Sequence, residues 1–177
     1  MKTDLAWKGQ VQVYTGDGKG KTTAALGLAL RALGTELKVF IGQFVKGMEY
    51  SEIKALTRFS GDITVRQYGL DCFIHNEPTV EDIKAARNGL QQVAEILEEG
   101  AHRVVILDEV NIATYYKLFS VAELLEILKN RHPGTEVILT GRKADPALLE
   151  FADLVTEMVE IKHYYQVGIE ARSGIES

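Results

Sequence analysis

The chain has 177 residues, 46 % of them hydrophobic and 25 % charged, which predicts one globular domain over residues 1–177 and excludes a disordered chain. The formal net charge of −5 argues against nucleic-acid binding, because phosphate backbones favour basic surfaces. A single cysteine excludes an internal disulfide. Asp4 interrupts any signal-peptide run and no apolar stretch approaches about 18 residues, so we expect a cytosolic protein that makes no membrane contact.

Short apolar, β-branched runs alternate with segments of helical period along the chain. Strands are expected at residues 10–14, 38–44, 63–68, 104–107, 136–140 and 154–159. Several are short and bounded by charge or glycine, which is typical of strands covered on both faces. This alternation predicts an α/β fold, a mostly parallel sheet with helices on both faces.

The expected helices lie between these strands. The first covers residues 21–33 and ends at Gly34. Thr79 and Asp82 form a predicted capping box for the longest helix, which continues to Gly100. A third helix covers residues 121–128, and Asp145 followed by proline is typical of the start of a fourth, which runs to residue 151.

Two segments lack a regular pattern, residues 47–60 and 69–78. Loops that follow strands in an α/β sheet are common ligand sites, so both segments are candidates for an active-site rim. They fit plain surface connections equally well.

Residues 15–23 carry the strongest functional signal, because they are rich in glycine and lysine and connect a strand to a helix. Glycines let successive backbone N–H groups face an anion, and the helix N-terminus adds partial positive charge. Lys21 is predicted to bind phosphate oxygens, and the Thr22 hydroxyl is predicted to ligate Mg²⁺. This is the pattern of a phosphate-binding loop, or P-loop.

The spacing of the loop departs from G-x-x-x-x-G-K-[ST]. Counting back from Gly20, the first glycine is expected at position 15, which is Thr15; Gly16 comes one residue late. We therefore expect a tighter cradle than in ordinary nucleotide hydrolases. With this loop, we expect the α/β fold to be the three-layer sandwich of the P-loop NTPases (RecA-like).

An apolar strand that ends in Asp108 and Glu109 completes the P-loop arrangement. A carboxylate at such a strand tip holds Mg²⁺ directly or through water. By itself a strand ending in two acids is common, but paired with the loop it indicates a metal site.

At this point the sequence resembles the ATP:corrinoid adenosyltransferases, over nearly the whole chain. The matching motifs are residues 15–23 with the late glycine, 43–47, 108–109, 137–142 and 152–158, and in the tail residues 162–163, 168, 171 and 174–176. The resemblance implies transfer of the 5′-deoxyadenosyl group of ATP to a Co(I) corrinoid, with release of triphosphate. It also implies that ATP lies reversed in the loop, with its 5′-carbon facing the corrinoid.

The resemblance assigns roles to individual residues. The nucleotide would be bound by Thr15, Gly16, Asp17, Gly18, Lys19, Gly20, Lys21, Thr22, Thr23, Lys46 and Arg142. Thr22 and Glu109 would ligate Mg²⁺, and Asp108 would support these ligands without binding the ion directly. For Arg142, a surface or structural role fits the sequence as well as a phosphate contact.

Reduction of Co(II) to Co(I) is the harder step, and in this family apolar residues displace the lower axial ligand of cobalt. Phe73 is in the matching position, while His75 replaces an expected aromatic. A Phe73 that simply packs inward is the other interpretation. By the same resemblance we expect a homodimer and a reduced flavoprotein as electron donor. His163 is expected to be a structural hydrogen-bonding residue, and a catalytic role is the other interpretation.

Two other functions fit the P-loop: a kinase or ATPase that cleaves the β–γ bond, and a non-enzymatic nucleotide-binding module of the RecA-like type. The late glycine and the family-like tail argue against the first. The lack of a basic stripe argues against a nucleic-acid-binding form of the second.

Overall fold

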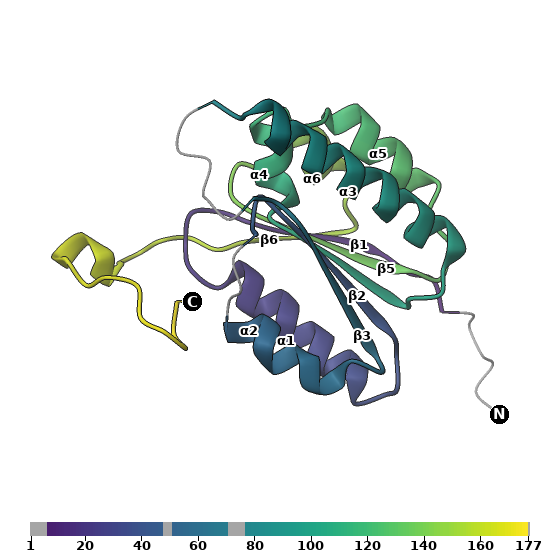
Figure 1. Ribbon diagram of the computed structural model, residues 1–177, viewed down its shortest axis with the longest axis horizontal. Coiled ribbons are helices and arrows are strands. Elements are labelled where there is room, and N and C mark those ends of the chain that lie inside the picture. Colours follow the sequence, from purple (N-terminus) through teal and green to yellow (C-terminus); the bar gives the residue numbers. More distant parts are fainter. Residues whose placement is uncertain (1–6, 48–50, 71–76, 177) are drawn as a thin grey trace.

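A six-stranded sheet forms the middle of the molecule in the computed structural model, which describes residues 7–47, 51–70 and 77–176 (Figure 1). The strands are β1 (Val11–Thr15), β2 (Val39–Phe44), β3 (Ile63–Tyr68), β4 (Val104–Asp108), β5 (Glu136–Thr140) and β6 (Leu154–Glu157). Their order is β3-β2-β4-β5-β1-β6, and every pair of neighbours is parallel. The carboxyl ends of all six strands therefore meet at one edge of the sheet.

Helices cover both faces of the sheet, so the expected three-layer α/β fold is confirmed (Figure 1). The helices are α1 (Lys21–Leu33), α2 (Ser51–Leu56), α3 (Val80–Glu99), α4 (Val110–Tyr115), α5 (Val121–Lys129) and α6 (Pro146–Phe151), with 3-10 turns η1 (Thr57–Phe59) and η2 (Tyr164–Val167). Alternate residues of β4 belong to different cores: Val105 and Leu107 pack with the α3 and α5 side, Val104 and Ile106 with the α1 side.

Local signals place the helix starts as expected. Thr79 and Asp82 make both bonds of the capping box at α3, and the Asp145 side chain accepts a hydrogen bond from Ala147 N at the start of α6. At the end of α3, Gly100 has φ 68° in the left-handed region.

Strand ends differ from expectation by one or two residues. The outermost strand β6 stops at Glu157, two residues early, because the carbonyl of the next residue, Met158, bonds to the phosphate-binding loop. β6 is also exposed along its whole length, because it is an edge strand with only β1 beside it.

Two short helices have no clear signal in the sequence. α2 lies within the irregular segment 47–60, and α4 begins directly after Glu109, which has φ 57°. A helix of six residues is too short to display a periodic apolar stripe. In the ranges that the structure describes, no helix has the length and apolar character needed to cross a bilayer.

Candidate active site

The phosphate-binding loop joins β1 to α1 and lies against the chain that follows β6. Gly16 and Gly20 have φ of 91° and 120°, values that favour glycine. A Cβ at Gly16 would lie 2.4 Å from Met158 O, and Gly18 N donates a hydrogen bond to the same oxygen at 2.7 Å. Gly16 is thus required both by its backbone conformation and by the close approach of Met158, the residue after β6, whereas Gly20 is required by its conformation alone.

Lys21 fills the interior of this loop. Its Nζ donates hydrogen bonds to Gly16 O at 2.8 Å and to Gly18 O at 2.7 Å, and the residue is only 7 % exposed. Burial, together with the nearby Arg142 guanidinium, lowers the pKa of Lys21. The ammonium is therefore held at the position that a phosphate group in the loop would approach.

Asp108, at the end of β4, is the most heavily bonded carboxylate of the site. It is 1 % exposed and accepts hydrogen bonds from Thr22 Oγ1 (2.8 Å), Thr140 Oγ1 (2.7 Å), Gln43 Nε2 (3.2 Å) and Lys46 Nζ (2.9 Å). Burial alone would raise its pKa, but the Lys46 charge and these bonds outweigh burial and lower the pKa. Asp108 is accordingly a buried anion with a full set of partners.

Glu109 follows Asp108 and turns toward the loop after β5. Its backbone N–H donates to Thr140 Oγ1 at 3.0 Å, and a Cβ at Gly141 would lie 3.1 Å from Glu109 Oε2. Lys46 Nζ is 4.0 Å from Glu109 Oε1. Burial raises the pKa of Glu109, and the neighbouring Asp108 adds to this rise while Lys46 opposes it. An additional cation beside this carboxyl would stabilise its ionised form.

The structure brings Thr22, Lys46, Asp108 and Glu109 together and places the remaining predicted residues around them. Thr15 is buried and its hydroxyl accepts a hydrogen bond from Ala144 N at 3.4 Å, whereas Asp17 and Thr23 are exposed. Arg142 is exposed, yet its charge acts on Lys21 and Glu109, so it belongs to the same edge of the sheet. Phe73 and His75 lie outside the described residues.

Lys19 contacts the C-terminal tail. Its Nζ donates to Ile175 O at 2.8 Å and lies 3.9 Å from Glu176 Oε1. Bonds from Arg172 and Tyr164 to Glu176 hold the pKa of that carboxyl at about 2. The tail, the yellow extension of Figure 1, is thus tied to the phosphate-binding loop. Sequence reasoning had no local signal for this contact.

His163 lies in the C-terminal tail, at the start of η2. His163 Nδ1 accepts a hydrogen bond from Tyr165 N at the start of η2, in keeping with the expected structural role.

Gln43 and Thr140, both partners of Asp108, were missed as site residues. Each is a polar residue at or beside the end of a strand that neighbours β4, and that position is the signal that could have found them.

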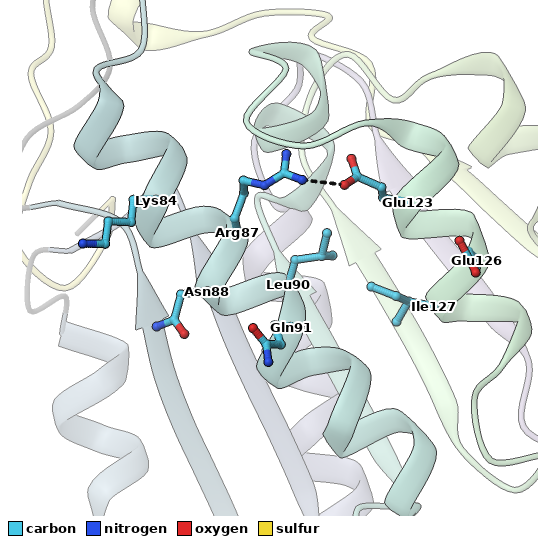
Figure 2. A pocket seen from close by; sticks show the side chains of 8 residues that line it. All are labelled: Lys84, Arg87, Asn88, Leu90, Gln91, Glu123, Glu126 and Ile127. Atoms are coloured by element: carbon cyan, nitrogen blue, oxygen red, sulfur yellow. Dashed lines mark hydrogen bonds and ion pairs between the residues drawn. The ribbon is translucent and has the colours of Figure 1, made fainter.

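A cavity of about 410 Å³ adjoins the loop, lined by Arg142 and by tail residues between 160 and 176. A second cavity, of about 530 Å³, lies between α3 and α5 (Figure 2). There Leu90 and Ile127 lie between charged residues, and an ion pair of 2.8 Å joins Arg87 to Glu123. None of the predicted site residues lines this second cavity, so the larger of the two cavities lies apart from the predicted nucleotide and metal site.

Comparison with known proteins shows the family to which the chain belongs. The profile of the family described as ATP:corrinoid adenosyltransferase BtuR/CobO/CobP matches residues 7–177. A corrinoid adenosyltransferase from Sinorhizobium sp. is 36 % identical over 99 % of this chain and 84 % of its own length. Those from Pseudomonas aeruginosa and Escherichia coli K12 are each 34 % identical over 96 % of this chain, and over 84 % and 86 % of their own lengths. The chain therefore belongs to the ATP:corrinoid adenosyltransferase family.

Proposed function

We propose that this enzyme transfers the 5′-deoxyadenosyl group of ATP to the Co(I) of a corrinoid, in the biosynthesis or salvage of adenosylcobalamin. Cobalt supplies the electron pair for the new Co–C5′ bond, the C5′–O bond breaks, and triphosphate leaves with that bond's electrons. Co(I) is a very strong nucleophile, so no general base is required. The protein must orient C5′ and stabilise the departing triphosphate.

The observation that carries this proposal is the compact loop around Lys21 beside the Asp108–Glu109 strand tip, in a chain of this family. The backbone N–H groups of the loop and the ammonium of Lys21 bind the polyphosphate. A late first glycine and the close support from Met158 fit a cradle that holds the entire triphosphate as a leaving group.

The donor set also fits Mg²⁺. Thr22, Asp108 and Glu109 supply oxygens, the ligands that this ion prefers, and triphosphate and water would complete its six positions. No cluster of three or more His, Cys, Asp or Glu side chains suited to a metal occurs in the described ranges, so the ion would depend on the nucleotide for ligands. When bound, Mg²⁺ neutralises the charge that develops on the leaving group.

Three further parts of the function rest on the family resemblance. We propose that Phe73 displaces the lower axial ligand of Co(II), that a reduced flavoprotein supplies the electron, and that the enzyme is a homodimer. We propose the cytosol as its location. Cob(I)yrinic acid a,c-diamide and cob(I)alamin both fit as substrates.

An anaerobic assay tests the proposal. The chain is mixed with ATP, Mg²⁺ and each of the two chemically reduced corrinoids, and formation of the light-sensitive carbon–cobalt bond is followed by absorbance. Chromatography of the products should yield triphosphate in step with the alkylated corrinoid. Release of ADP and phosphate without any carbon–cobalt bond would instead identify a β–γ-cleaving ATPase.

A further inference from the structure

Lys46 lies among the three side chains assigned above to Mg²⁺. Its Nζ donates to Asp108 Oδ2 at 2.9 Å and to Thr22 Oγ1 at 3.5 Å, and it is 4.0 Å from Glu109 Oε1. A full positive charge on a lysine thus stands at the point on which these oxygens converge.

The backbone that carries Lys46 is closely packed. Val45, just before it, has φ 61°, and a Cβ at Gly69 would lie 2.4 Å from Lys46 N. This segment is therefore packed tightly between the end of β2 and the turn after β3. The ammonium can change place by rotation about the four-carbon side chain, while the backbone stays where it is.

Mg²⁺ and this ammonium cannot share the site. Mg²⁺ needs oxygen ligands at about 2.0–2.1 Å, and a lysine charge bonded to the same carboxylate would repel the ion at short range. Removing the ammonium without a replacement would leave Asp108, at 1 % exposure, as a buried charge without its cationic partner, which is costly. One cation has to replace the other.

We propose that Lys46 is the resident counter-ion of this site before nucleotide binds, and that it gives way to Mg²⁺ and moves to a triphosphate oxygen when Mg–ATP binds. The inference rests on the proposed function, which supplies the Mg–ATP. The triphosphate is the anion that offers Lys46 a new partner at the moment it loses Asp108. Free Mg²⁺ brings no such anion, so the nucleotide-free enzyme resists the metal and accepts it together with ATP.

The test is a Mn²⁺ titration of the full chain without nucleotide, followed through the electron paramagnetic resonance of free Mn²⁺. Mn²⁺ prefers the same oxygen ligands as Mg²⁺. We expect weak binding by the wild-type chain and binding about 10- to 100-fold tighter by Lys46→Met. Lys46→Gln keeps an N–H donor for Asp108 and should gain similarly, so the test survives if the methionine variant fails to fold.

Two controls define the outcomes. Lys84→Met, on α3 at the cavity of Figure 2, makes the same change of net charge away from the site and should bind Mn²⁺ like the wild type. Adding Asp108→Asn to Lys46→Gln should abolish the gain. Unchanged Mn²⁺ affinity in both Lys46 variants, or an equal gain in Lys84→Met, overturns the inference. Failure of the wild-type chain to alkylate Co(I) refutes the proposed function instead, because the titration uses neither ATP nor corrinoid.

Discussion

Replacing Gly16 by alanine perturbs the contact between the phosphate-binding loop and β6 at a single atom. The added Cβ would lie 2.4 Å from Met158 O and 2.8 Å from Met158 N, closer than such atoms approach in folded proteins. Because both neighbours are backbone atoms of the strand's continuation, no side-chain rotation relieves the contact. Either the loop or the end of β6 has to shift.

The cost can be worked from two contributions. An alanine at φ 91° is forced into the left-handed region at about 1–2 kcal/mol, and a shift that breaks the bond from Gly18 N to Met158 O adds about 1 kcal/mol. We expect the free energy of unfolding to fall by about 2–3 kcal/mol. The affinity for ATP should fall by about ten-fold or more, since each loss of about 1.4 kcal/mol in binding free energy raises Kd ten-fold.

Urea unfolding and calorimetric titration with ATP measure these two effects. Gly27→Ala, inside α1, is the matched control, because nothing lies within 4 Å of its Cβ position. It should raise the free energy of unfolding by about 0.5–1 kcal/mol and leave ATP affinity unchanged. A Gly16→Ala chain as stable as the wild type and equally able to bind ATP would refute the assigned loop geometry.

Three other changes have defined outcomes. Lys21→Met should abolish most ATP-dependent corrinoid alkylation, by about 10²-fold or more, while the far-ultraviolet circular dichroism spectrum stays that of the folded chain. Its melting temperature should fall moderately, because Gly16 O and Gly18 O lose their donor; retained activity would contradict its phosphate-binding role. Phe73→Ala should slow assays that start from Co(II) more than assays that start from chemically made Co(I), and equal losses would argue against ligand displacement. Burial lowers the pKa of His102 below its unfolded value, so the unfolded chain binds more protons and the free energy of unfolding falls as pH drops through 6.5. His102→Phe keeps a ring beside Phe40 and should flatten this decline in urea titrations between about pH 7 and 5; an unchanged slope would assign the pH dependence to other groups.

Features encoded by neighbouring residues were predictable from the sequence. The strand–loop–helix around Lys21 and the capping box of Thr79 and Asp82 depend on residues within a few positions of one another, and the structure has both. The existence of all six strands was predicted too. Their order was not, since it depends on how the helices cross over the sheet.

The contact between Lys46 and Asp108 illustrates what the sequence alone leaves open. The two residues are 62 positions apart, and they meet because β2 lies beside β4. Sequence reasoning placed both in the site but assigned Lys46 to phosphate, without a signal that its ammonium bonds to the carboxylate. The tie between Lys19 and the tail is longer still, 156 positions, and depends on a segment with little regular structure.

The phosphate-binding loop takes its support from the outermost strand, β6, which is exposed along its length and paired on one side only. Edge strands open locally at lower free energy than the centre of a sheet. On warming, β6 can therefore detach while the strands around β4 remain folded, and the anion cradle would be dismantled with it. The enzyme would then lose its affinity for nucleotide at a temperature below the one at which the central strands of the sheet unfold.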